Sequence, residues 1–220
     1  MENTGKIISF LRDLAEHNDR SWFNDNKTRY DEVLGVFESF VNQLIPEIRN
    51  FDSSIDLITA KDCTFRIYRD VRFSNDKSPY KTNMGAYIAK GGRKSSWAGY
   101  YVHFEPGRSM LAGGMYMPLA EQLRKIRDEI YFNAVELENI LTDEGFMKYY
   151  SNLDEEYKMT RPPKGYPSDF PHIDLLKYKS YVVTHMIGDS LAGSGDFLFH
   201  ATGACKALFP LNAFLNRIFI

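Results

Sequence analysis

The sequence predicts an α+β fold in which an antiparallel β-meander of four to five strands packs with N-terminal and C-terminal helices. Three observations support this prediction. Apolar residues recur at helical spacing at both ends of the chain, they alternate with a period of two in the middle, and no linker separates the two patterns. We therefore expect a single domain over residues 1–220, which is long enough to bury a sizeable core.

Helices are expected in the first fifty residues. Thr4 can cap a helix over residues 4–17, where apolar residues recur at the spacing of one helical face. The polar residues that follow end this helix, and Ser21 can cap a second, longer helix with an apolar stripe of its own. Pro46 falls inside that stripe, so we expect a kink there.

The middle of the chain shows the alternation of β-strands. The pattern predicts strands over residues 64–73, 84–89, 96–105, 109–116 and 179–187. Gly91 and Gly92 predict a hairpin turn between the second and third strands, and short connections of this kind favour an antiparallel meander. Helical spacing resumes over residues 118–131, 133–141, 142–150 and 194–219.

The composition is that of an ordinary globular protein. Hydrophobic residues make up 44% of the chain and charged residues 25%, and the net charge is −2. This balance gives no reason to expect an extended nucleic-acid duplex or an anionic membrane as a partner. The charge is uneven, however, because residues 61–94 hold nine cations and only three carboxylates. A basic middle in an acidic chain favours a local site for a small anion.

Cysteine usage and the first residues predict a cytoplasmic protein. Cys63 and Cys205 lie far apart in apolar contexts and outside any metal-ligand spacing, which indicates buried thiols in a reducing compartment. Arg12 and Asp13 interrupt the only early apolar run, so we expect no signal peptide. No segment reaches the ~18 apolar residues of a membrane span.

Residues 65–81 are the main candidate site. If the predicted strand is regular, Arg69 shares a face with four large apolar residues and needs a carboxylate or a bound anion. We expect the segment to recognise a phosphate-type small molecule or a nucleotide, because the planar guanidinium binds such groups with two hydrogen bonds. The candidate binding residues are Arg66, Tyr68, Arg69, Arg72, Lys77, Tyr80 and Lys81.

Two other interpretations of this segment stay open. The arginines can be purely structural, in which case each has a carboxylate partner and no cavity lies beside them. The segment can also belong to a non-enzymatic interaction module that docks a protein or single-stranded nucleic acid, which requires exposed aromatic side chains at Tyr68, Trp97 and Tyr100.

Catalytic candidates are few, and whether the protein is an enzyme stays open. His103 and Glu105 alternate onto one face of a predicted strand, and together with Asp70 they are the proton carriers expected in the strand block. The phosphate-loop, dinucleotide-binding and serine-nucleophile motifs are absent from the sequence. We expect no metal and no cofactor, and the oligomeric state stays open.

Five segments together resemble a known family: Asn18–Tyr30, Phe65–Thr82, Gly99–Pro106, Gly113–Tyr116 and Leu176–Ser180. They are similar to the bacterial and fungal domain-of-unknown-function family 2461, and the resemblance extends over nearly the whole chain. It implies one full-length domain. It implies no activity, cofactor or catalytic residue, so function has to be argued from the residues themselves.

Overall fold

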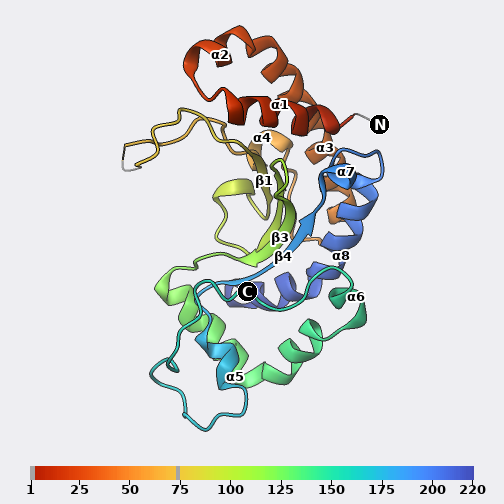
Figure 1. Cartoon of the computed structure of the whole chain (residues 1–220). Coiled ribbons are helices and arrows are strands. Elements are labelled where there is room, and N and C mark those ends of the chain that lie inside the picture. The colour runs from red at the N-terminus through yellow and green to blue at the C-terminus, as the bar shows by residue number, and fades with distance from the viewer. Residues whose placement is uncertain (1–2, 73–74) are drawn as a thin grey trace.

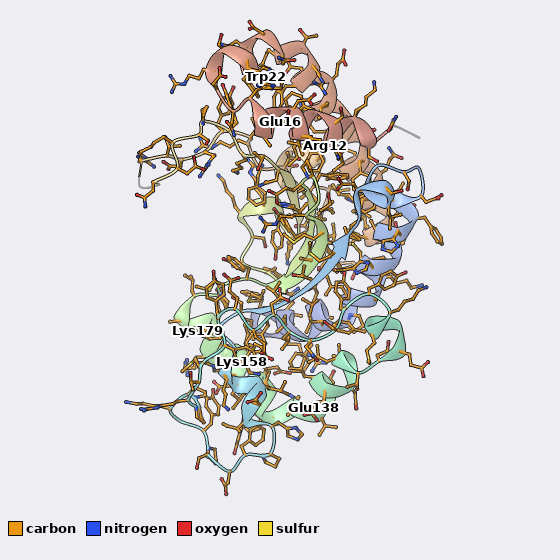
Figure 2. All side chains as sticks on the ribbon, in the orientation of Figure 1. Arg12, Glu16, Trp22, Glu138, Lys158 and Lys179 are labelled. Carbon is orange, nitrogen blue, oxygen red and sulfur yellow. The ribbon has the colours of Figure 1, made fainter. Side chains whose placement is uncertain are left out.

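The fold is α+β, as predicted, with one antiparallel sheet between two groups of helices (Figure 1). The computed structural model describes residues 3–72 and 75–220. Within those residues the sheet has four strands in the order β1-β2-β3-β4. Trp22 near the start of the chain and Glu138 in its second half mark opposite ends of the molecule, with the sheet between them (Figure 2).

The N-terminal helices are α1 (Gly5–Glu16), α2 (Arg20–Asp25), α3 (Lys27–Arg49) and the single turn α4 (Ala60–Cys63). Their caps differ from the predicted ones. Asp19 caps α2, because its carboxylate accepts hydrogen bonds from the backbone N–H groups of Ser21 and Trp22. Thr4 stands at the N-cap of α1, but its side chain makes no capping hydrogen bond, because its hydroxyl donates to the carbonyl oxygen of Ala192.

The strands predicted over 84–89, 96–105, 109–116 and 179–187 are confirmed with slightly different ends. They form β1 (Met84–Ile88), β2 (Gly99–Phe104), β3 (Ser109–Met115) and β4 (Tyr181–Ile187), each antiparallel to the next. The connection from β1 to β2 is longer than a tight hairpin. Gly91 and Gly92 have φ angles of 81° and 79°, which favour glycine, and lead into the 3₁₀ turn η1 (Gly92–Lys94).

The remaining helical elements are α5 (Ala120–Leu141), α6 (Glu144–Met147), η2 (Ile173–Lys177), α7 (Asp189–Ala192), α8 (Phe197–Asn216) and η3 (Arg217–Phe219). The helices predicted over 118–131 and 133–141 are both present within α5, and a kink at Asn133, where the backbone is not helical, separates them. Pro46 and Pro210 lie inside α3 and α8 without ending them. In the part of the chain that the structure describes, no helix has both the length and the apolar character that crossing a bilayer requires.

One face of the sheet packs on α3 and α8 and forms the main core. Phe104 of β2 is fully buried there, and its ring meets Phe37 and Phe40 of α3 and Phe197 of α8 edge-on. Side chains alternate along a strand, so every second residue points to the opposite face of the sheet. In Figure 1, α3 and α8 lie on one side of the strands and the loop with η1 lies on the other.

Residues 64–72 and 75–82 form an arm beside β1, where the sequence predicts a strand over 64–73. That prediction is wrong for the described residues, which exclude Phe73. The arm pairs through two isolated bridges: Thr64 with Ala86, and Tyr68 with Tyr80. Arg69 donates its backbone N–H to the carbonyl oxygen of Pro79 (3.0 Å), but Pro79 has no N–H to donate in return. The ladder therefore breaks at this pair.

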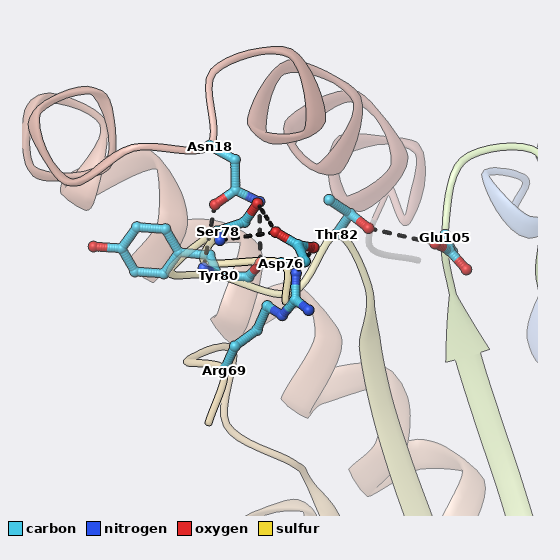
Figure 3. Close-up of polar contacts among 7 residues, drawn as sticks. All are labelled: Asn18, Arg69, Asp76, Ser78, Tyr80, Thr82 and Glu105. Atoms are coloured by element: carbon cyan, nitrogen blue, oxygen red, sulfur yellow. Dashed lines mark hydrogen bonds and ion pairs between the residues drawn. The ribbon is translucent and has the colours of Figure 1, made fainter. Parts of the chain in front are cut away.

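Asn18 holds the arm against the N-terminal helices (Figure 3). Its side-chain amide donates to the carbonyl oxygen of Tyr80 (3.0 Å) and accepts from the N–H of Tyr80 (3.2 Å). Phe23 of α2 stacks on the Tyr80 ring, with the ring centroids 3.9 Å apart. The two longest segments that carry the family resemblance, residues 18–30 and 65–82, are therefore in direct contact.

Candidate functional site

The strand residues that face away from α3 and α8 form rows across the sheet. One row consists of Tyr87, Tyr101, Ala112 and Thr184, and the next consists of Gly85, His103, Met110 and Met186. Hydroxyl groups, an imidazole and aromatic rings thus share a face that the long helices leave open. A concave, mostly apolar surface with a few convergent polar groups is the usual setting of a small-molecule site.

A cleft of about 790 Å³ lies on this open face. Its floor comes from the strands, one wall from the arm and the β1–β2 loop, and the other wall from residues 116–122 and 154–157. The volume falls within the roughly 300–1,000 Å³ of small-molecule sites. The lining side chains that matter most below are Phe65, Lys81, Arg93, Trp97, Tyr101 and Tyr116.

The arm places a lysine without an anionic partner at the cleft. Lys81 Nζ lies 5.7 Å from the centre of the Phe65 ring, and it forms no hydrogen bond or ion pair with the described residues. Burial lowers the pKa of Lys81, and the positive charge of Arg66 lowers it further. The two cations repel each other, so an anion bound beside them would relieve an unfavourable interaction.

The loop between β1 and β2 adds a second cation and an aromatic ring to the same wall. Arg93 is held by a hydrogen bond to the carbonyl oxygen of Lys61. Trp97 stacks on Phe219 with ring centroids 5.1 Å apart, and Lys90 Nζ lies 4.4 Å from the centre of the Trp97 ring. These contacts fix the indole at the rim of the cleft.

The opposite wall carries hydroxyls and carboxylates. The hydroxyls of Tyr116 and Tyr157 lie 3.5 Å apart, and Asp154 accepts a hydrogen bond of 2.7 Å from the hydroxyl of Thr184. Burial raises the pKa of Asp154, and the charge of Glu156 raises it further. Cations on one wall and carboxylates on the other favour a ligand whose negative end lies against the arm.

A row of hydrogen-bonded side chains on β2 ends at the cleft floor. The Tyr101 hydroxyl lies 3.0 Å from His103 Nδ1, and His103 Nε2 lies 3.1 Å from Glu105 Oε2. His103 is only 7% exposed. Burial and the charge of Glu105 raise the pKa of Tyr101 to about 12. Thr82 of the arm donates to the other oxygen of Glu105 at 3.4 Å (Figure 3).

Two of the predicted arginines are paired with carboxylates of the arm itself. Arg69 forms an ion pair with Asp76, and hydrogen bonds from Ser78 together with this pair lower the pKa of Asp76 (Figure 3). Arg72 contacts both oxygens of Asp70, at 2.9 and 2.6 Å. The predicted place of Arg69 on a buried apolar face is wrong, because the arm is not a regular strand. Of the three predicted proton carriers, His103 and Glu105 are in contact with each other. Asp70 is paired with Arg72 in the arm instead.

The remaining arm residues have different surroundings. Lys77 donates to a backbone carbonyl of the arm, and Tyr80 is buried against α2. A docking surface is expected to expose Tyr68 and Tyr100. Tyr68 is 48% exposed, but Tyr100 lies in the core and is 1% exposed. Among the predicted binding residues, all of which the structure describes, only Lys81 lines the cleft.

Sequence reasoning missed Tyr87 and Asp154 as residues of this site. The sequence does carry a signal for Tyr87: large aromatic side chains occur on both faces of the predicted strands. Aromatic residues on a sheet face without covering helices indicate a binding surface. Asp154 had no local signal, since it lies in the long excursion between β3 and β4. Across residues 3–72 and 75–220, no three His, Cys, Asp or Glu side chains are arranged to hold a metal ion.

These features define an α+β protein with helices on one face of an antiparallel sheet and a ligand-sized cleft on the other. The chain belongs to the DUF2461 family, described as conserved hypothetical proteins, because the model of that family matches residues 6–214. The matched range contains every cleft residue discussed above. Neither the curated proteins nor the solved structures provide a match to this chain.

Proposed function

We propose that this protein binds a small anionic molecule, such as a phosphorylated compound or a nucleotide, in the cleft on the open sheet face. Lys81 holds the negative group, and Arg66 and Arg93 add positive charge nearby. An aromatic part of the ligand has three rings to pack against: Phe65, Trp97 and Tyr101. The proposal moves the anion site from the basic segment as a whole to the point where the arm meets the cleft.

The observation that carries the proposal is the surroundings of Lys81. A partly buried ammonium group is costly unless an anion accompanies it. The charge of Arg66 adds to that cost, as the lowered pKa of Lys81 reflects. A purely structural network accounts for Arg69 and Arg72, which have carboxylate partners, but gives Lys81 none among the residues that the structure describes.

The opposite wall supports the same orientation of the ligand. Asp154 and Glu156 line the cleft on the side away from the arm. Their carboxylates disfavour a negative group there, so a phosphate is expected at the Lys81 end and a polar, uncharged or cationic part at the other.

Replacing Lys81 by methionine tests the proposal, because the change keeps the length of the side chain and removes its charge. We expect wild type to bind at least one of inorganic phosphate, nucleoside monophosphates and sugar phosphates in titration calorimetry. Lys81→Met should weaken that binding about tenfold or more, since a hydrogen bond to a charged group contributes about 1.5–3 kcal/mol.

Lys77→Met is the matched control. It removes the same charge from the same arm, but Lys77 contacts a backbone carbonyl outside the cleft. We expect its affinity to stay within about twofold of wild type. The proposal fails if wild type binds none of these anions. Equal weakening by the two substitutions would return the site to the arm as a whole.

A cytoplasmic location is part of the proposal. Cys63 and Cys205 are unpaired and buried, and burial raises the pKa of both thiols to about 12. Protonated, inaccessible thiols of this kind suit a reducing compartment.

A further inference from the structure

The row Tyr101–His103–Glu105 connects a carboxylate to a hydroxyl that borders the cleft. Tyr101 lines the cleft, His103 is buried behind it, and Glu105 closes the row beside the arm. Of these three residues, Tyr101 is the one that lines the cleft.

Hydrogen-bond chemistry fixes the direction of this row. The Glu105 carboxylate can only accept, so His103 Nε2 carries the hydrogen that points to it. In the neutral imidazole, Nδ1 is then the acceptor, and the Tyr101 hydroxyl donates to it. Burial and the charge of Glu105 raise the pKa of the Tyr101 hydroxyl, so attack by its oxygen needs a base beside it. His103 is placed to take that proton, and Glu105 is placed to stabilise the imidazolium that forms.

The backbone leaves room for this arrangement at Gly85, which pairs with His103 across the strands. A Cβ at Gly85 would lie 2.5 Å from the Tyr101 hydroxyl oxygen and 3.0 Å from its ring. The Tyr101 ring thus lies over Gly85, and the absence of a side chain there sets the position of the hydroxyl.

The turn between β2 and β3 does not depend on this row. The Ser109 hydroxyl donates to the carbonyl oxygen of Glu105 and accepts from the N–H of Glu105, at 2.9 and 3.1 Å. These two bonds hold the turn through the backbone. The side chain of Glu105 is left to orient His103.

We propose that Tyr101 is a nucleophile for phosphate esters bound in the cleft, activated by His103 and Glu105. This inference rests on the proposed function, because Lys81 has to hold the phosphate. The Tyr101 oxygen forms a bond to phosphorus while its proton passes to His103 Nδ1. The bond from phosphorus to the leaving alcohol breaks, and the departing alkoxide takes a proton from solvent in the cleft. A water molecule then forms a bond to phosphorus, the bond from phosphorus to the Tyr101 oxygen breaks, and His103 returns its proton to that oxygen. The released phosphate keeps the protons of the water.

Covalent labelling tests the activation of Tyr101 without knowledge of the natural ester. The reagent is 4-(fluorosulfonyl)benzoate, a tetrahedral electrophile that carries an aromatic ring and a negative charge. Attack by Tyr101 forms an O–S bond, expels fluoride and transfers the phenolic proton to His103. We expect mass spectrometry of peptides to show Tyr101 labelled at least tenfold faster than Tyr116, although Tyr116 is 66% exposed in the same cleft and has no histidine beside it.

Three variants separate activation from simple accessibility. His103→Gln should lower the labelling rate of Tyr101 at least tenfold. Glu105→Gln should also lower the labelling rate, because the imidazolium that forms loses the carboxylate beside it. Gly85→Ala keeps all three groups of the row and should lower the rate by displacing the hydroxyl. The proposal is overturned if Tyr101 reacts no faster than Tyr116, or if His103→Gln leaves the rate unchanged.

Neutral benzenesulfonyl fluoride distinguishes this inference from anion binding. If both reagents label Tyr101 at equal rates, and those rates depend on His103, the proposal of an activated tyrosine is supported and the proposal of an anion site is contradicted. If phosphate binds through Lys81 in calorimetry but the labelling of Tyr101 does not depend on His103, the anion site stands and the nucleophile fails.

Discussion

His185 of β4 and His200 of α8 face each other through the same nitrogen. Their Nε2 atoms lie 2.9 Å apart, and the Tyr149 ring packs edge-on against both imidazoles. Burial lowers the pKa of both side chains, with a further contribution from His200 at His185 and from Lys148 at His200. Only one of the facing nitrogens can carry a hydrogen while the pair is neutral, so a second proton is strongly disfavoured.

This contact predicts a loss of stability in mild acid. The folded-state pKa values lie below the unfolded value of about 6.5, so the unfolded chain binds more protons as the pH falls. The stability that the neutral pair contributes is complete above about pH 6.5 and decreases below it. Urea unfolding between pH 8 and 5 should show this decrease. His200→Gln should reduce its slope, and an unchanged slope would contradict the assignment.

Among the elements, the arm depends most on a single contact from elsewhere in the chain. Its described residues pair through two isolated bridges, and Pro79 interrupts the ladder. Asn18 supplies the two backbone hydrogen bonds that a neighbouring strand would otherwise provide at Tyr80. The loop between α1 and α2 therefore acts as a substitute strand for one residue pair.

Asn18→Ala should destabilise the protein by about 1–3 kcal/mol, because it leaves a part-buried N–H and C=O of Tyr80 without partners. Urea unfolding gives the total loss. Hydrogen exchange at the backbone N–H groups of Arg69 and Lys81 should accelerate as the arm loosens. Asn24→Ala, on the exposed side of α2, is the control and should change neither quantity. Equal behaviour of the two variants would show that Asn18 does not hold the arm.

In the molecule as a whole, the two faces of the sheet have different tasks. Phe104 and its neighbours between the sheet and the long helices form the core, whereas the opposite face forms the floor of the cleft. Stability and ligand recognition are thus separated by the thickness of one sheet. Along one strand, successive residues therefore contribute alternately to the stability of the core and to the floor of the cleft.

Paired substitutions on the two faces test this separation. Phe104→Ala should cost about 3–5 kcal/mol of unfolding free energy, because it leaves a cavity among the rings of Phe37, Phe40 and Phe197. Met110→Ala, on the open face, should cost much less, since Met110 is only partly buried at the cleft. Chemical denaturation of both variants provides the comparison. Similar losses would mean that the cleft face is covered in solution.

The sequence predicts the layers of this fold better than its site. The strand pattern of the sequence predicts β1 to β4, and all four form with slightly different ends. The same pattern misplaces a strand at 64–73, because periodicity does not register that Pro79, ten residues from Arg69, lacks the returning N–H. The basic charge of the segment places Lys81 among seven predicted binding residues. It does not indicate which of the seven lines the cleft. That selection depends on tertiary contacts of Asn18.

The two hydrogen bonds between the Asn18 side chain and the Tyr80 backbone make anion binding in the cleft depend on the beginning of the chain. Lys81 follows Tyr80 directly, so the position of its ammonium group depends on an amide sixty residues earlier. Coupling of this kind is reciprocal in free energy. An anion that favours the docked arm also stabilises the hydrogen bonds between Asn18 and Tyr80, and loss of those hydrogen bonds weakens the binding of the anion. The N-terminal helices are therefore an energetic part of the binding site, although they contribute no side chain to the lining of the cleft described above.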